Sequence, residues 1–193
     1  MRIHIATDHA GLEFSTQLQH HLAGQGHDVV DHGPVEYDPV DDYPSFCIRA
    51  ARAVVDDRAR GVDALGVVFG GSGNGEQIAA NKVAGVRAAL VWSIATAELA
   101  REHNDANVIA IGARQHAFGD VVSFIVRSIQ TPFSGDERHV RRIAPLAPHE
   151  ADGPPEPDPR ADRCPRVIPS TRTPSRSPSA PSRAPPAPLP PSC

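Results

Sequence analysis

A glycine-rich stretch at positions 70–76 has the composition of a loop that binds an anion. It reads Gly-Gly-Ser-Gly-Asn-Gly-Glu and comes directly after an apolar run at 64–69. Glycines let backbone N–H groups come close to a ligand, and a helix that begins after the loop adds the positive end of its dipole. The acid at the end of this loop, Glu76, would repel an anion, so we interpret it as a chemical group. A tight turn that binds nothing is the structural alternative.

This stretch does not match the common nucleotide-binding loops. It has no Lys-Ser or Lys-Thr pair, which a Walker A loop requires. Glu76 also occupies the position that the third glycine takes in the G-x-G-x-x-G pattern. These departures disfavour a plain flavodoxin-like module that binds a nucleotide.

Two pairs of polar residues could add acid–base groups. Asp8 and His9 follow the strand-like alternation at 2–6, and His103 and Asn104 lie between a helical pattern and an apolar run. Asp and His are common proton-transfer groups. Asp8 could equally cap the helix that follows it, and His103 could be an ordinary loop residue.

Arginines form the fourth candidate group. Arg138 and Arg142 are spaced i, i+4, so on a helix they would share one side, and Arg114 stands earlier in the chain. Such a cluster is normally a solvated face, but two guanidinium groups on one side can also bind a phosphate bidentately.

Alternating strand and helix patterns position these residues. Strand patterns occupy 2–6, 28–31, 64–69, 87–92 and 108–111, and helix patterns occupy 12–25, 43–58, 76–83, 93–102 and 118–130. Short apolar strands separated by amphipathic helices predict an α/β fold: a doubly wound, Rossmann-like, five-stranded parallel sheet in a three-layer α/β/α sandwich. A flavodoxin-like order, 2-1-3-4-5, would bring the end of the first strand and the glycine loop to one crevice.

Composition narrows the class of protein. The chain has 193 residues, 40% of them hydrophobic, and a net charge of −4, so it has no general nucleic-acid footprint. The three cysteines, Cys47, Cys164 and Cys193, lack metal-ligand spacing and favour a reduced, cytoplasmic setting. We see no signal peptide and no membrane span in the sequence, and we expect no membrane partner.

Proline marks a boundary near residue 144. Sixteen of the 20 prolines lie from Pro145 onward, among Ser and Arg residues. Such a segment has too few large apolar side chains to offset the entropy of ordering it. We therefore predict a domain at 1–146 and a disordered tail at 147–193, with docking to a proline-binding partner as a less favoured reading.

Taken together, the motifs resemble ribose-5-phosphate isomerase type B, in the wider family that includes galactose-6-phosphate isomerase subunits. The chain matches in order at Thr-Asp-His-Ala-Gly (7–11), Gly-Ser-Gly-Asn-Gly-Glu (71–76), Ile-Ala-Ala-Asn-Lys (78–82), Glu-His-Asn (102–104) and the arginines at 138 and 142. Many members carry a cysteine base where this chain has Gly70. The resemblance is to the branch in which a glutamate after the loop, here Glu76, takes that role.

The resemblance implies interconversion of ribose 5-phosphate and ribulose 5-phosphate, in the pentose phosphate pathway, without a metal or another cofactor. Glu76 would move the proton between two carbons and His103 would open the sugar ring. Asp8, Ser72 and Asn104 would contact the hydroxyls of the substrate. The loop Gly71, Ser72, Gly73, Asn74 and Gly75 would then hold the enediolate rather than the phosphate.

The resemblance further implies that His9, Arg114, Arg138 and Arg142 bind the phosphate, and that the active sites lie at the interface of a homodimer, some arginines coming from the partner. Two alternatives stay open. One is an isomerase of a six-carbon aldose phosphate, such as galactose 6-phosphate or allose 6-phosphate. The other is a catalytically silent sugar-phosphate sensor whose tail docks a partner.

Overall fold

The computed structural model describes residues 1–34, 36–147 and 150. All of these belong to one compact unit, Met1–Pro155. The tail predicted at 147–193 lies, except for residues 147 and 150, outside the described residues.

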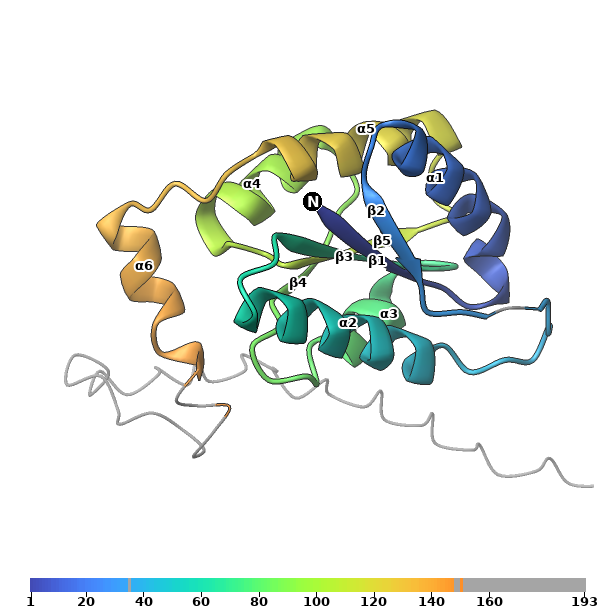
Figure 1. Cartoon of the computed structure of the whole chain (residues 1–193), viewed down its shortest axis with the longest axis horizontal. Helices are drawn as coiled ribbons and strands as arrows, with labels where there is room; N and C mark the ends of the chain where they lie inside the picture. Colours follow the sequence, from blue (N-terminus) through green and yellow to red (C-terminus); the bar gives the residue numbers. More distant parts are fainter. Residues whose placement is uncertain (35, 148–149, 151–193) are drawn as a thin grey trace, which may run out of the picture. The chain divides into compact units, whose positions relative to one another are not determined.

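Five parallel strands form one sheet in the order β2-β1-β3-β5-β4 (Figure 1). The strands are β1 (Arg2–Ala6), β2 (Asp28–Asp31), β3 (Ala64–Gly70), β4 (Ala88–Leu90) and β5 (Val108–Gly112). Every residue of β3 is buried, as expected of a central strand covered on both faces.

Helices cover both faces of the sheet, which confirms the predicted three-layer, doubly wound fold. The helices are η1 (His9–Gly11), α1 (Leu12–Gly24), α2 (Tyr43–Ala59), α3 (Asn74–Ala80), α4 (Ile94–Asn104), α5 (Phe118–Gln130) and α6 (Glu137–Ile143). Figure 1 shows α1, α4 and α5 over one face and α2 and α3 over the other, and two separate apolar clusters fill the two layers.

The pleat of the strands assigns their side chains to these clusters. In β3, Leu65, Val67 and Phe69 point to the layer of α1, α4 and α5, whereas Val68 points to α2 and α3. Burying each of these side chains stabilises the fold by about 1.5–3 kcal/mol. The polar residues that follow each strand are therefore held in place by a rigid, well-packed sheet.

The predicted order of the last two strands was wrong. We expected β4 beside β3, but β5 takes that place and β4 lies at the edge. The reason is burial: all five residues of β5 are buried and pair along β3 from Gly66 to Gly70, whereas β4 has three residues and two of them are partly exposed. The part of the order that positions the crevice, β2-β1-β3, is as expected.

One helix begins earlier than predicted and another lies outside the predicted helix ranges, and both matter for the site. Helix α3 begins at Asn74, not at Glu76, because Gly73 adopts a left-handed φ of 79° and turns the chain into the helix. Glu76 therefore lies in the first turn of α3. Helix α6 contains Arg138 and Arg142, so their i, i+4 spacing does place them on one helix.

Candidate active site

Glu76 lies at the carboxyl end of β3, buried beneath the glycine loop. Its side chain is only 4% exposed, and one carboxylate oxygen, Oε2, is buried with no hydrogen-bond partner among the described residues. A buried carboxylate without a full set of partners is costly to the fold. Such a group is typical of a functional site rather than of a structural one.

Gly70 makes the space that this carboxyl group occupies. A Cβ atom placed on Gly70 would overlap the Cδ and both oxygens of Glu76. A side chain at position 70 and the Glu76 carboxyl are therefore alternatives for the same volume. This gives a physical reason why a chain with an acid at position 76 has glycine at position 70.

Burial raises the pKa of Glu76 above its usual range, and the negative charge of Asp8 adds to the effect. The same two causes act on Cys47 of α2: burial, then the charges of Glu76 and Asp8, raise the pKa of this thiol to about 12. Cys47 is fully buried in the layer of α2 and α3, so it is a core residue.

Asp8 and His9 lie at the end of β1, beside β3. Asp8 caps the short helix η1, since its Oδ1 accepts a hydrogen bond of 2.9 Å from the N–H of Ala10. The interpretation of Asp8 as a cap is thus correct, and the charge of the same carboxylate raises the pKa of Glu76.

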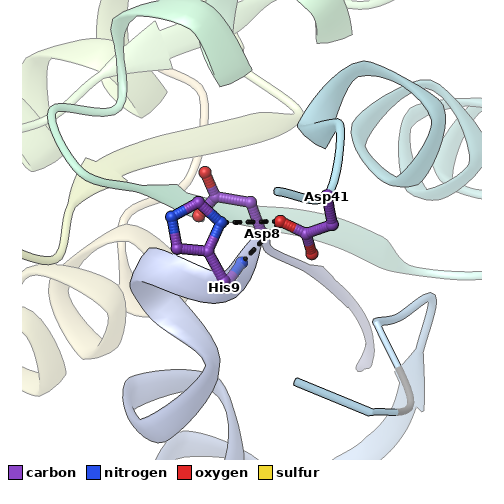
Figure 2. Close-up of side chains that lie close together, drawn as sticks. All are labelled: Asp8, His9 and Asp41. Atoms are coloured by element: carbon purple, nitrogen blue, oxygen red, sulfur yellow. Dashed lines mark hydrogen bonds and ion pairs between the residues drawn. The ribbon is translucent and has the colours of Figure 1, made fainter. Parts of the chain in front are cut away.

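Asp41, which we did not single out from the sequence, holds His9. Its Oδ1 lies 2.7 Å from Nδ1 of the His9 ring and also accepts the backbone N–H of His9 at 3.1 Å (Figure 2). Asp41 stands in the connection between β2 and α2, 32 residues away from His9. No local pattern in the sequence signals such a contact.

Asp8, His9 and Asp41 each offer one possible metal-ligand atom, and these atoms lie within 4.8 Å of one another. A divalent cation would accept this combination of one imidazole and two carboxylates. In the present geometry Oδ1 of Asp41 bonds Nδ1 of His9, and Oδ1 of Asp8 accepts the N–H of Ala10, so these atoms are already engaged.

The glycine loop connects β3 to α3 at the same edge of the sheet. Ser72 Oγ accepts hydrogen bonds from the N–H and the side-chain Nδ2 of Asn74, at 3.4 and 3.2 Å. Ser72 and Asn74 line a surface hollow of about 410 Å³, and Gly75 lies in the first turn of α3. Arg114 lies beside the loop, with its Nη1 3.6 Å from the position that a Cβ of Gly71 would take.

His103 and Asn104 lie on the opposite side of the sheet, where the parallel strands begin. We call this side the amino edge, and the side on which the strands end, where Glu76 lies, the carboxyl edge. They end α4, and β5 begins four residues after Asn104, so both residues lie at the amino end of β5. Glu76 lies beyond the carboxyl end of β3, which runs parallel to β5. A five-residue strand spans roughly 16 Å, so one chain does not bring His103 and Glu76 together.

Arg138 and Arg142 accompany His103 rather than Glu76. The ring of His139, between them on α6, is buried and lies with its centroid 4.2 Å from that of His103. Nδ1 of His139 is 2.7 Å from Oγ of Ser134, and burial, together with the charge of His103, lowers the pKa of His139. His139 thus fixes α6 to α4; the sequence placed it among the arginines without indicating this role.

The predicted site residues therefore form two groups. At the carboxyl edge lie Asp8, His9, Gly71, Ser72, Gly73, Asn74, Gly75, Glu76 and Arg114, and at the amino edge lie His103, Asn104, Arg138 and Arg142. Among the residues that the structure describes, no helix has the length and apolar character needed to cross a membrane.

A family model described as ribose/galactose isomerase matches residues 3–146, which is most of the chain and includes both groups of site residues. The chain belongs to the ribose/galactose isomerase family. The resemblance stated from the sequence motifs is therefore confirmed, and the fold agrees with it.

Individual members of the ribose/galactose isomerase family are similar over nearly their whole length. The ribose-5-phosphate isomerase B of Mycolicibacterium paratuberculosis is 51% identical over 150 residues, which are 78% of this chain and 92% of the relative. That of Mycobacterium tuberculosis is 48% identical over 159 residues, 81% of this chain and 96% of the relative.

Solved structures of the family have the same fold. The ribose-5-phosphate isomerase B of Mycoplasma genitalium, crystallised with bound ribulose-5-phosphate, matches with a TM-score of 0.73 and 37% identity, covering 78% of this chain and 97% of that one. The Trypanosoma cruzi type B enzyme matches with a TM-score of 0.71 and 42% identity, covering 78% and 99%.

Proposed function

We propose that the chain is an aldose–ketose isomerase that interconverts ribose 5-phosphate and ribulose 5-phosphate. The observation that carries the proposal is the Glu76 carboxyl, buried under the glycine loop with one oxygen unpartnered among the described residues. The names of relatives about 50% identical and the ligand of the Mycoplasma genitalium structure support the choice of substrate.

Glu76 is the base in this proposal. It removes the proton from the carbon beside the carbonyl and returns it to the neighbouring carbon, so one carboxylate serves both transfers. A positioned acid–base group contributes on the order of 10²–10⁴-fold. Burial, which raises the pKa of Glu76, makes it a stronger base than an exposed glutamate at neutral pH.

The glycine loop stabilises the enediolate that forms between the two transfers. Its negative charge develops on oxygen, and backbone N–H groups of residues 71–75 are donors suited to hold it. Ser72 contacts a substrate hydroxyl through its Oγ. Asp8 orients the sugar ring, since it follows β1, the strand that pairs with β3.

A homodimer completes the site. His103, Asn104, Arg138 and Arg142 lie one strand length from Glu76, so a second copy of the chain has to supply them. Apolar side chains are exposed on the elements around β4: Ile78, Trp92, Ile94, Leu99, Val140 and Leu146. A groove of about 670 Å³ runs along β4, and Asn104, Arg142 and Trp92 are among its lining residues. We assign this surface to the dimer interface.

In the dimer, the phosphate lies between the two subunits. His9 and Arg114 approach it from the subunit that carries Glu76, and Arg138 and Arg142 from the other subunit. His103 of that other subunit moves the proton on the ring oxygen, and Asn104 binds the sugar hydroxyls.

The chain has few cysteines, and Cys47 is a buried free thiol. The cytoplasm is therefore the compartment that we expect for this protein.

The decisive experiment measures isomerisation of ribose 5-phosphate by the wild type and by Glu76→Gln, with EDTA present. We expect turnover by the wild type and a loss of at least about 100-fold in kcat for the variant, with ribose 5-phosphate still bound. Glu13→Gln, at an exposed site on α1, is the matched control.

Undiminished activity of Glu76→Gln would assign the base elsewhere, with Asp8 the next candidate. No activity of the wild type would direct the assay to six-carbon sugar phosphates. Binding of both classes without any proton exchange would instead favour a sensor.

A further inference from the structure

Asp41 makes an unusual double contact with His9. One oxygen, Oδ1, accepts hydrogen bonds from both the backbone N–H and the ring Nδ1 of His9, at 3.1 and 2.7 Å. Since Asp8 also fixes this turn through the N–H of Ala10, the backbone of His9 is held on both sides. An ionised carboxylate is only an acceptor, so the hydrogen between Asp41 and the ring belongs to Nδ1.

The charge of Asp41 is enclosed. The side chain is 7% exposed, and its second oxygen, Oδ2, is buried with no partner among the described residues. A carboxylate oxygen of Asp8 lies within 4.8 Å of this pair, and the ring of Tyr37 meets the imidazole edge-on with centroids 6.3 Å apart. Among the described residues, the imidazole of His9 is the basic group that lies within ion-pair distance of Asp41, at 2.7 Å.

Figure 2 shows the second nitrogen of the His9 ring, Nε2, on the side away from Asp41. The His9 side chain is 25% exposed, so a ligand can reach it. A phosphate oxygen needs a donor, and Nε2 donates while Nδ1 is bonded to Asp41 only if the imidazole carries both hydrogens.

We infer that Asp41 is a positioning residue that holds His9 as an imidazolium, with Nε2–H presented to the phosphate of the substrate. The inference rests on the proposed function, in which His9 contacts that phosphate. Asp41 itself does not touch the substrate. It fixes the orientation of the ring and supplies the negative charge that a doubly protonated imidazole requires.

A purely structural role is the alternative. Asp41 belongs to a turn in which Asp38 also bonds the N–H of Val40, so loss of Asp41 could merely loosen this connection. A double-mutant cycle separates the two roles, because a positioning effect requires His9 to be present and a loosened loop does not.

The experiment compares Asp41→Asn in the wild type and in His9→Asn, reading KM and kcat for ribose 5-phosphate and the inhibition constant of inorganic phosphate. Asn keeps an acceptor at position 41 but removes the charge. Asp42→Asn is the control, since Asp42 is exposed and its side chain makes no capping hydrogen bond to α2.

We expect Asp41→Asn to raise KM and the phosphate inhibition constant about tenfold, the equivalent of one charge-assisted hydrogen bond, with kcat changed less than about twofold. In His9→Asn the same substitution is expected to change KM less than about twofold. Equal factors in both backgrounds, or a fall in kcat alone, would overturn the inference.

A second readout does not depend on turnover, so it stands even if the wild type fails to isomerise ribose 5-phosphate. Nitrogen-15 NMR of the histidine rings, with inorganic phosphate added, reports the hydrogens on Nδ1 and Nε2 of His9. We expect both nitrogens to be protonated with phosphate bound, and this state to be lost in Asp41→Ala. A neutral His9 with its hydrogen on Nε2 alone would contradict the inferred pairing of Asp41 with Nδ1 of His9.

Discussion

At the scale of single residues, a side chain at position 70 would occupy the space that the carboxyl group of Glu76 fills. A Cβ on Gly70 would overlap that carboxyl group, and the packing around it leaves Oε2 without a partner among the described residues. The glycine was visible in the sequence as part of the loop. Its role in making room for the Glu76 carboxyl was not, because it depends on the contact between the end of β3 and the first turn of α3.

Gly70→Ala is therefore expected to displace the Glu76 carboxyl. We expect kcat/KM to fall about 100-fold, because a misplacement of about 1 Å has that effect, and stability to fall by about 1–3 kcal/mol. Kinetics and thermal unfolding measure the two effects. Gly119→Ala is the control, since nothing lies within 4 Å of a Cβ at that helical position, and it should be neutral or slightly stabilising. A fully active Gly70→Ala would contradict the packing.

The pH dependence of turnover reports on Glu76. The base acts when ionised, so kcat/KM falls as the pH drops through the pKa of Glu76, which burial places above its ordinary 4.5. We expect the acidic midpoint of the profile above pH 4.5. Asp8→Asn is expected to lower that midpoint but to leave it above 4.5, since the charge of Asp8 is a smaller cause than burial. A midpoint at or below 4.5 would mean that Glu76 is not the titrating group.

At the scale of elements, a buried chain of hydrogen bonds ties β1 to its neighbours. His4 of β1 lies 3.0 Å from Asp57 of α2 through Nε2 and 2.9 Å from His32, which follows β2, through Nδ1. Arg2 and Arg60 also bond Asp57 and keep its pKa well below the usual range. This network stabilises β1, the strand that Asp8 and His9 follow.

The network predicts a loss of stability in acid. Burial lowers the pKa of His4 and lowers that of His32 to about 4, with the charge of His4 adding in the second case. Between about pH 6.5 and pH 4 the unfolded chain binds protons that the folded chain does not, so stability falls with falling pH. Each kcal/mol lost lowers Tm by about 2–4 °C.

Thermal unfolding at pH 7 and pH 5 measures this effect in the wild type, in His32→Asn and in His20→Asn. We expect the difference in Tm between the two pH values to shrink in His32→Asn, because that variant has one buried histidine fewer. His20 is exposed on α1, so its loss should leave the difference unchanged. Other groups, Glu76 included, act alike in all three proteins. An unchanged difference in His32→Asn would contradict the assignment.

At the scale of the whole molecule, the candidate residues are divided between the two edges of the sheet. The chain order of the motifs did not indicate this division. It follows from the direction of α4, which runs against the strands and so ends at their amino edge. The resemblance to the family had placed only some arginines on the partner; the proposed dimer adds His103 and Asn104 to that set.

Mixing two inactive variants tests the division. Glu76→Gln and His103→Asn are each expected to be inactive, but a mixed dimer would contain one site with both residues intact. After random exchange of subunits, we expect about a quarter of the wild-type activity to return. Glu76→Gln mixed with Arg114→Gln is the control, since both residues lie at the same edge and no intact site can form. No recovery in the first mixture would mean that each chain works alone.

The sequence by itself determined the features that adjacent residues encode. The apolar alternation and the helical periodicity located β1, β2 and α5 to the residue, and the glycine loop with Glu76 indicated a candidate base. The family motifs, read in order, indicated the same site residues that the structure divides between the two edges.

Only the tertiary structure decided which residues meet. In this structure β5 lies between β3 and β4, and the side chain of His9 is bonded to Asp41. The ring of His103 packs against that of His139 and lies far from Glu76. These outcomes depend on how completely a strand is buried and on contacts between residues far apart in the chain. Periodicity and composition are local properties, so they fix which element a residue belongs to, whereas packing fixes its neighbours.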